Sequence, residues 1–396
     1  MTIVPLRARK LAAAGVALGM LVVIPAAAHA APASSNAAPS GRNAPLKLNQ
    51  MQVIGTQNSF HQEPPANEKA IRLALTGPQV EQTIEYTHAS VAKQLGEQKV
   101  RQLEFDVYAD PTGGKYATPY LRVAAGNGPM DPVMNQPGAK VLHLQDVDYH
   151  SSCLTFVKCL QQVKDWSDRN RDHVTVAIML EFQDRPLIVP GETEPRPGTV
   201  IPIKWDRAEM LGLEREILSV FPRDRLVTPD NVRKPGKTLE QSVLQDGWPT
   251  VDSTRGKILF MMDNDGTYRD SYLQGNPSLQ GRLLFTNSKP GVPDAAFMKR
   301  YVWDQGGVAE ITALVRKGYL VRTRADADTM QARNNDTSTR DTALATGAQW
   351  VSTDYPVPGM ASRFNGSPYY AAIPGGYTAR CNPLTAPSYC NCGLLN

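Results

Sequence analysis

Residues 100–108 read Val-Arg-Gln-Leu-Glu-Phe-Asp-Val-Tyr and residues 174–181 read Val-Thr-Val-Ala-Ile-Met-Leu-Glu, and these two stretches decide the fold. The first alternates with a period of two, which predicts a β-strand. The second is almost continuously apolar, which is typical of a strand covered on both faces. Buried strands of this kind belong to parallel sheets flanked by helices, so the two stretches favour an α/β fold.

Outward from these stretches, strand-like runs alternate with helical segments along the chain. We predict further strands at 51–55, 139–143, 257–262, 320–322 and 349–353, and helices at 89–98, 154–167, 207–220, 308–317 and 341–346. At a length of 396 residues this alternation predicts a (β/α)8 TIM-type barrel. A doubly wound sheet is the alternative, but the first strand is not followed by a glycine-rich phosphate loop.

The amino terminus has the three parts of a secretory signal peptide. A basic segment, Arg7–Lys10, precedes an apolar run of 14 residues, Leu11–Ile24, which is too short for a typical membrane-spanning helix. Ala28-His-Ala30 then provides small residues for cleavage. We therefore predict that residues 1–30 are removed and that the protein is secreted to the extracellular side.

The charge balance excludes one class of partner. The chain has 42 Lys and Arg against 38 Asp and Glu, and 3 of the basic residues lie in the predicted signal peptide. Removing those 3 from the 42 leaves 39 basic residues against 38 acidic ones, a net charge of +1. A nucleic-acid-binding protein normally has a clear basic excess, so we do not expect one here. We also expect no transmembrane segment and a monomer.

The remaining chain divides by composition. Residues 31–45 are small and polar, which predicts a flexible leader, residues 46–356 form the predicted barrel, and residues 357–396 form a cysteine-containing tail packed on it. Cys153 and Cys159 can close a local loop, while Cys381, Cys390 and Cys392 can pin the tail. Five cysteines leave at least one outside any internal pairing, and disulfides explain their placement better than catalysis does.

Polar side chains gather at or just past the ends of several predicted strands, which is the catalytic face of a barrel. Glu104 and Asp106 are two residues apart and so share one face of their strand, and Glu181 ends an otherwise apolar strand. Together with the amide oxygen of Asn58 they form an all-oxygen set, which suits Ca²⁺ or Mg²⁺ and not zinc. His143 leaves a strand among acidic residues and is a candidate general acid.

These residues lie in segments that resemble the secreted bacterial Ca²⁺-dependent phosphoinositide-specific phospholipase C family. The resemblance covers residues 46–356, and the order and spacing of the segments make it specific. The segments are Gly55-Thr-Gln-Asn-Ser-Phe-His61, Arg101-Gln-Leu-Glu-Phe-Asp-Val-Tyr-Ala-Asp110, Val141-Leu-His143, Ile178-Met-Leu-Glu181, Val321-Arg-Thr-Arg-Ala-Asp-Ala-Asp328 and Gly347-Ala-Gln-Trp-Val-Ser-Thr-Asp-Tyr-Pro356.

The resemblance implies roles for individual residues. It implies that the calcium ligands are Asn58, Glu104, Asp106 and Glu181. His143 corresponds to the histidine that protonates the diacylglycerol leaving oxygen. A calcium-bound carboxylate, Glu181 or Glu104, could act as the base for the inositol 2-hydroxyl.

Gln57 departs from the pattern, because family members usually carry a histidine at this position of the Gly-Thr-His-Asn-Ser motif. Glutamine can donate a hydrogen bond but cannot exchange a proton near pH 7. We expect the chain to carry His61 away from the phosphate, so that it does not substitute for the missing histidine.

The late segment offers candidate substrate contacts. Arg322 and Arg324 could bind phosphate or inositol hydroxyls, although an ion-pair network at the barrel rim is an equally good interpretation. Asp263 follows a predicted strand and is a further candidate for contact with the headgroup.

Three functions are therefore open. The first is a secreted, Ca²⁺-dependent phosphodiesterase that cleaves phosphatidylinositol at a membrane surface into diacylglycerol and a cyclic inositol phosphate, with activity in doubt because of Gln57. The second is a calcium-dependent phosphoinositide-binding or inositol phosphate-binding pseudoenzyme. The third is a glycerophosphodiester phosphodiesterase built on the same barrel.

Overall fold

The computed structural model describes residues 45–390 and 392–395. The predicted signal peptide, residues 1–30, and all but the last residue of the predicted leader lie outside the described residues.

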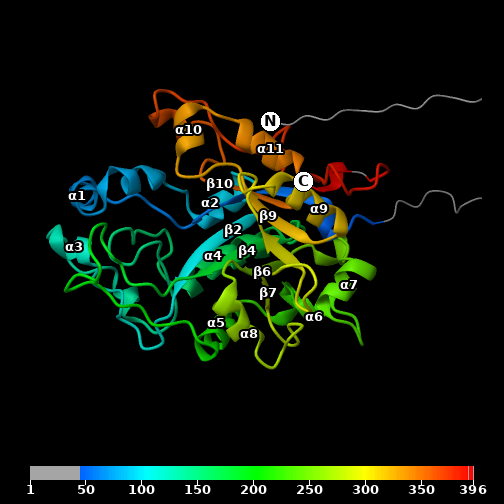
Figure 1. Ribbon diagram of the computed structural model, residues 1–396, viewed down its shortest axis with the longest axis horizontal. Helices are drawn as coiled ribbons and strands as arrows, with labels where there is room; N and C mark the ends of the chain where they lie inside the picture. Colours follow the sequence, from blue (N-terminus) through cyan, green and yellow to red (C-terminus); the bar gives the residue numbers. More distant parts are fainter. Residues whose placement is uncertain (1–44, 391, 396) are drawn as a thin grey trace, which may run out of the picture. The chain divides into compact units, whose positions relative to one another are not determined.

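Eight parallel strands form a closed barrel at the centre of the molecule (Figure 1). Hydrogen bonds connect each strand to the next around the ring, and an isolated parallel bridge between Asn287 and Phe297 closes the gap between the fifth and sixth strands. The prediction of a TIM-type barrel is confirmed. The strands are β1 (Met51–Thr56), β2 (Gln102–Tyr108), β4 (Val176–Phe182), β6 (Ile258–Met262), β7 (Leu284–Thr286), β8 (Phe297–Lys299), β9 (Leu320–Arg324) and β10 (Trp350–Thr353).

Three further strands distort the ideal barrel. Strand β3 (Lys140–Val141) runs antiparallel to β2, β11 (Ala379–Cys381) runs antiparallel to β1, and β5 (Leu226–Val227) runs parallel to the first part of β6. The prediction of a full strand over 139–143 is therefore wrong, because only two residues pair and they lie outside the parallel ring. His143 consequently follows a short antiparallel segment and not a barrel strand.

Helices surround the strands (Figure 1). Helix α4 illustrates why they form: the side chain of Thr155 accepts a hydrogen bond from the backbone N–H of Lys158, and the helix buries Phe156, Leu160 and Val163. The helices are α1 (Ala66–Thr83), α2 (Val91–Gly96), α3 (Tyr120–Ala124), α4 (Phe156–Arg169), α5 (Arg207–Val220), α6 (Pro229–Val232), α7 (Leu239–Gln245), α8 (Gly266–Leu273), α9 (Gly307–Lys317), α10 (Met330–Asn334) and α11 (Ser338–Ala345).

The interior of the ring is polar where β1, β2 and β10 meet. A Cβ atom at Gly55 would lie 1.9 Å from Oε1 of Gln102, so only glycine leaves room for that amide. The same Oε1 accepts a hydrogen bond from the hydroxyl of Ser352 at 2.6 Å. The glycine in the first motif therefore has a packing role two residues before Gln57.

Two disulfides fix local segments. Cys153 pairs with Cys159 at the start of α4, and Cys381 in β11 pairs with Cys392, while Cys390 belongs to neither bond. Disulfides of this kind fit an extracellular location, where they form and persist. Within the described residues, none of the helices combines the length and the apolar character needed to cross a bilayer.

Candidate active site

The turn after β1 is fastened to β2. The hydroxyl of Ser59 accepts a hydrogen bond from the N–H of Glu104 at 2.8 Å, and the N–H of Ser59 donates to the carbonyl of Glu104 at 2.9 Å. The preceding residue, Asn58, has a φ of 42°, in the left-handed region that asparagine tolerates better than most residues. The amide of Asn58 is thereby fixed beside the strand that carries Glu104.

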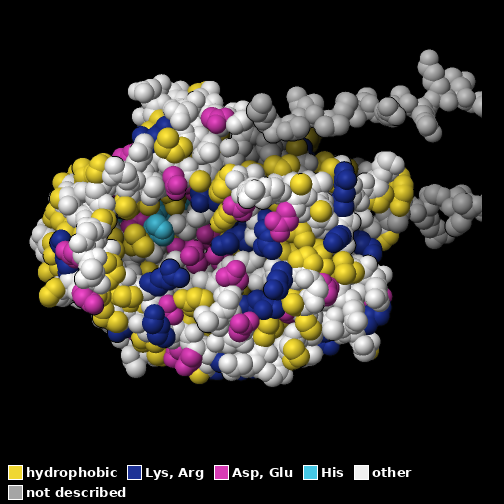
Figure 2. Space-filling view, in the orientation of Figure 1, with side chains coloured by type: hydrophobic (Ala, Val, Ile, Leu, Met, Phe, Trp, Pro, Cys, Tyr) yellow, Lys and Arg dark blue, Asp and Glu magenta, His cyan; other side chains and the backbone are white. Residues whose placement is uncertain are grey.

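Three carboxylates converge at this end of the barrel, and we call them the acidic group: Glu104, Asp106 and Glu181. Glu104 and Asp106 lie on one face of β2, and Glu181 on β4 is the register partner of Asp106. One ligand oxygen from each of the three lies within 4.8 Å of the other two. Figure 2 shows acidic side chains gathered near the middle of one face, between a histidine and several basic side chains.

Buried acceptors next to the acidic group lack donors. Both carboxylate oxygens of Asp106 and Oδ1 of Asn58 are buried and accept no hydrogen bond from the described residues. A buried charge without a partner is costly, and Asp106 is fully buried. Oxygens in this state fit a hard divalent cation such as Ca²⁺, so Asn58 and the acidic group are chemically suited to hold one.

The pKa values of the acidic group reflect this crowding. Burial, and then the charges of Glu181 and Glu104, raise the pKa of Asp106 well above its usual range. Burial, and then Asp263 and Glu104, raise the pKa of Glu181 to about 7. Without a cation the three acids therefore resist ionising together.

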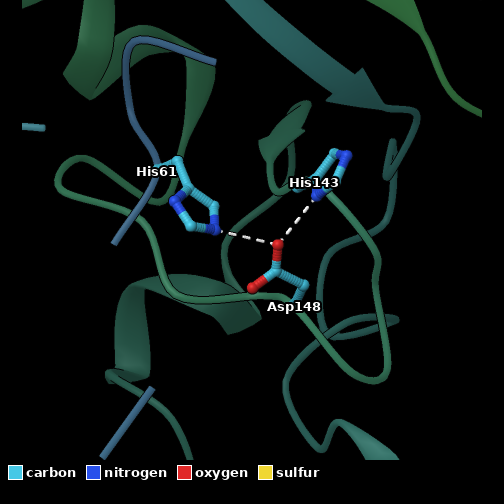
Figure 3. Close-up of side chains that lie close together, drawn as sticks. All are labelled: His61, His143 and Asp148. Carbon is cyan, nitrogen blue, oxygen red and sulfur yellow. Dashed lines mark hydrogen bonds and ion pairs between the residues drawn. The ribbon is translucent and has the colours of Figure 1, made fainter. Parts of the chain in front are cut away.

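His143 and His61 share one carboxylate (Figure 3). Nδ1 of His143 lies 2.7 Å from Oδ2 of Asp148, and Nε2 of His61 lies 2.9 Å from the same oxygen. Burial lowers the pKa of His143, whereas its hydrogen bond to Asp148 and the charges of Asp148 and Glu181 raise it, and the net pKa lies above its usual value. The side chain of His143 is 24% exposed, so it remains accessible from the barrel mouth.

The ring centroids of His61 and His143 are 6.1 Å apart, and the separation of His61 from a substrate phosphate stays a prediction. The side chain is nevertheless fully buried, and Nδ1 is engaged by the carbonyl of Tyr86 at 3.0 Å. His61 is therefore close to the other histidine but shielded from any substrate.

The same three residues, His61, His143 and Asp148, could in principle hold a metal ion. However, the guanidinium of Arg72 lies 2.5 Å from the other oxygen of Asp148, and its positive charge opposes a second cation there. Asn58 and the acidic group have the chemistry for calcium, whereas this histidine cluster has the chemistry for proton transfer.

The side chain of Gln57 contacts an arginine, and its backbone carbonyl lies 2.8 Å from Nε2 of His88. Nη2 of Arg322 donates to Oε1 of Gln57 at 2.9 Å and to Oε2 of Glu104 at 2.6 Å, and Nε of Arg322 donates to Ser352 at 2.9 Å. The side chain of Arg322 is fully buried. Gln57 therefore lies beside the acidic group, with its carbonyl oxygen directed at a fixed positive charge.

The other two candidate substrate contacts are also in ion pairs. Arg324 donates to the carboxylate of Asp354 at 3.0 Å, and Lys299 pairs with Asp263 at 2.5 Å. The backbone N–H of Asp263 donates to the carbonyl of Leu180 at 2.8 Å, which places Asp263 beside the residue that precedes Glu181. These pairs match the ion-pair interpretation of the rim, and a role in substrate binding stays a prediction.

Sequence reasoning missed the partners of His143. Asp148 lies only five residues after His143 in the sequence. Its hydrogen bond to His143 nevertheless depends on the conformation of the loop between them, which the sequence does not specify. Arg72 comes from α1, 76 residues away in sequence from Asp148, and no local pattern signals that contact.

Residues 46–383 match the family model described as phosphoinositide phospholipase C, Ca²⁺-dependent. No curated protein matches the sequence significantly.

Solved structures with a similar fold include two forms of the calcium-dependent phosphoinositol-specific phospholipase C from Pseudomonas sp. The apo form is 14% identical, covers 85% of this chain and 95% of that chain, and gives a TM-score of 0.47. Its myoinositol complex is 13% identical with the same coverage and a TM-score of 0.48. The phosphatidylinositol-specific enzyme from Streptomyces antibioticus is 14% identical over 78% of this chain and 95% of that chain, with a TM-score of 0.48.

The family model spans most of the chain, including every residue of the acidic group and both histidines of the Asp148 cluster, so the chain belongs to the Ca²⁺-dependent phosphoinositide phospholipase C family.

Proposed function

We propose that the protein is a secreted, Ca²⁺-dependent phosphodiesterase that cleaves phosphatidylinositol into diacylglycerol and a cyclic inositol phosphate. The observation that supports this most strongly is the set of unpartnered buried oxygens on Asn58 and Asp106 beside a partly exposed histidine, His143. Bound calcium would supply a Lewis acid for the phosphodiester. Asn58, Glu104, Asp106 and Glu181 are the residues that would hold it.

His143 is suited to act as the general acid. Its Nδ1 faces Asp148, so Nδ1 carries a proton and Nε2 is the nitrogen left for the substrate. The raised pKa of His143 keeps a proton on the ring near neutral pH, ready for the glycerol oxygen as it leaves.

Glu181 is the better candidate for the base. Nη2 of Arg322 donates to Oε2 of Glu104 at 2.6 Å and so occupies one oxygen of that buried carboxylate. Glu181 is only partly buried and is therefore the more accessible of the two to a substrate hydroxyl.

Removal of calcium tests the proposal directly. We expect EDTA to abolish cleavage of phosphatidylinositol vesicles, because the acidic group cannot hold its charges together without a cation. Release of water-soluble inositol phosphates measures the loss, and excess Ca²⁺ should restore it. Full activity in EDTA would contradict the metal assignment, and hydrolysis of glycerophosphoinositol without a cyclic product would point to a glycerophosphodiesterase.

Gln57 favours a second candidate, a calcium-dependent phosphoinositide-binding protein with negligible turnover. Its side chain accepts from Arg322 and supplies no exchangeable proton near pH 7. Such a protein would bind phosphatidylinositol vesicles in calcium and release no product.

The Gln57→His variant separates the two candidates. If the protein is an impaired enzyme, the variant should cleave phosphatidylinositol about 10²–10³-fold faster, the usual contribution of a charged or proton-exchanging group at the reacting phosphate. Initial rates at saturating calcium measure the gain. Gln57→Leu is the matched control, because it also changes the contact with Arg322 but adds no titratable ring. No cleavage by either the original chain or Gln57→His, with calcium binding intact, would favour the binding protein.

A further inference from the structure

The side-chain amide of Gln57 has one orientation. Its Oε1 accepts a hydrogen bond from Nη2 of Arg322 at 2.9 Å. A guanidinium has only donors, so the amide nitrogen cannot take that position, and Nε2 lies on the other side of the amide. Nε2 donates no hydrogen bond to any of the described residues, and Gln57 is partly exposed, whereas Thr56 and Asn58 on either side of it are buried. The end of Gln57 that remains open to a ligand is therefore the NH2 donor.

Arg322 is itself held from several sides. Its Nε donates to the hydroxyl of Ser352 at 2.9 Å, and Nη2, besides holding Gln57, donates to Oε2 of Glu104 at 2.6 Å. Nη1 lies 3.5 Å from the hydroxyl of Tyr301. The side chain of Arg322 is fully buried, so the guanidinium does not itself reach a substrate. Arg322 can therefore influence a reaction at the barrel mouth only through the residues that it holds.

The residues behind Arg322 fix the direction of its hydrogen bonds. Nε2 of Gln102 donates to a backbone carbonyl at 2.7 Å, which leaves Oε1 of Gln102 as an acceptor. The hydroxyl of Ser352 donates to that Oε1 at 2.6 Å, so its lone pairs face Nε of Arg322. Gln102 fits there because Gly55 has no Cβ atom. A continuous series of hydrogen bonds therefore connects Gln102 to the amide of Gln57, and each bond has one possible polarity.

We propose that Arg322 is a positioning residue, which fixes the amide of Gln57 so that its NH2 group faces the barrel mouth and donates a hydrogen bond to a phosphate oxygen of the substrate. The proposal rests on the proposed function, since it names a ligand atom for the same site. Ionised carboxylates of the acidic group offer only acceptors to such an oxygen, and Gln57 supplies a donor beside them. Gln57 then serves as a neutral donor of fixed direction, and Arg322 affects turnover through it.

Nuclear magnetic resonance of the Gln57 side chain tests the orientation without any reference to activity. In the ligand-free full chain with ¹⁵N-labelled glutamine, the NH2 protons of Gln57 should exchange with water as fast as those of an exposed amide, because they make no hydrogen bond. Their signal is assigned by its absence from the Gln57→Leu spectrum, and the Arg322→Lys variant should shift it. An unshifted signal in that variant, or NH2 protons protected from exchange, would overturn the proposal. This readout stands even if the protein proves not to cleave phosphatidylinositol.

The Gln57→Glu variant separates the donor from the contact with Arg322. Glutamate has nearly the same shape and keeps an oxygen towards Arg322, but a second oxygen replaces the NH2 group. We expect cleavage of phosphatidylinositol vesicles at saturating calcium to fall about 10²-fold or more, the usual loss when one donor to a reacting oxyanion is removed. Cleavage by Gln57→Glu at the rate of the original chain would show that the donor has no role, which contradicts the proposal.

A double-mutant cycle tests whether Arg322 acts through Gln57. Arg322→Lys keeps the charge but cannot hold the same partners together, because lysine lacks the planar fork of donors. We expect kcat to fall about tenfold in the original chain, with KM nearly unchanged, and about twofold or less in the Gln57→Leu background. Arg282→Lys is the matched control and should leave kcat unchanged in both, since Arg282 pairs with the buried carboxylate of Glu214 at 3.0 Å before the start of β7, at the opposite end of the barrel. Equal losses for Arg322→Lys in the two backgrounds would rule out action through Gln57.

Discussion

The His143→Gln variant is expected to cleave phosphatidylinositol about 10²–10⁴-fold more slowly, because glutamine fills a similar space but cannot deliver a proton to the leaving glycerol oxygen. Nδ1 of His143 is fixed by Asp148 at 2.7 Å, so the ring presents one nitrogen in one orientation, and glutamine loses both the proton and the geometry. Steady-state kinetics on vesicles should show the loss in kcat, with KM changed much less.

The control for this variant is His150→Gln. The side chains of His143 and His150 are both 24% exposed, and both pair with a fully buried carboxylate at 2.7 Å. The two substitutions should therefore affect stability similarly, and only His143→Gln should affect catalysis. Calcium binding, measured by calorimetry, should persist in both. Equal activity of the two variants would rule out His143 as the general acid.

The Asp106→Asn variant should lose calcium binding and, with it, on the order of 10³-fold in activity, equivalent to about 4 kcal/mol in the barrier. Asp106 is fully buried with two unpartnered oxygens, so an amide there removes a charge from the centre of the acidic group and places a donor where an acceptor is needed. Calorimetry with Ca²⁺ measures the first effect, and vesicle assays measure the second.

Thermal unfolding adds an independent prediction for Asp106→Asn. A carboxyl whose folded-state pKa is raised destabilises the folded protein above its unfolded-state pKa, so at pH 7 the calcium-free variant should melt at a temperature equal to or above that of the original chain. The original chain should gain about 2.7 kcal/mol when free Ca²⁺ is 100 times the Kd, and the variant should lack this gain.

Asp224→Asn provides the comparison, because Asp224 is an exposed acid in the short 3-10 helix Arg223–Arg225 just before β5, outside the acidic group. Asp224→Asn should behave like the original chain in calcium calorimetry, in the vesicle assay and in thermal unfolding. A calcium-dependent rise in melting temperature that survives in Asp106→Asn would show that the ion binds elsewhere.

Much of the barrel could be predicted from the sequence because its central strands carry strong local signals. Residues of β2 alternate between polar and apolar side chains and those of β4 are almost continuously apolar, and both patterns predict strands. The structure buries all seven residues of β2, so its polar side chains lie inside the protein and not in solvent. The helix predicted at 207–220 has the same bounds as α5, where Asp206 caps the first turn.

Other strands could not be predicted from the sequence, for physical reasons. Strands β7 and β8 have three residues each, too few to show a period, and the ring closes between them through a single bridge. The apolar run that includes Val141 looked like a strand, yet its pairing is set by the antiparallel return along β2 and not by its own composition.

Some residues of the candidate site could likewise be predicted from the sequence, and others could not. Glu104, Asp106 and Glu181 could be grouped from sequence, because strand geometry alone brings i and i+2 to one face and because parallel neighbours lie in register. The positions of His61 and Arg72 could not, since each depends on a loop or helix that reaches Asp148 from a distant part of the chain.

The pairing of β1 has a consequence for the order in which the protein can fold. Val53 is the register partner of Trp350 in β10 and of Ala379 in β11, about 300 residues later in the chain. Contacts between such distant segments form slowly and require the intervening chain to be present. The strand that leads into Gln57 and Asn58 therefore completes its pairing only after nearly all of the chain has been synthesised. Ribosome-bound intermediates that stop before β10 should lack this pairing and remain loosely structured around β1.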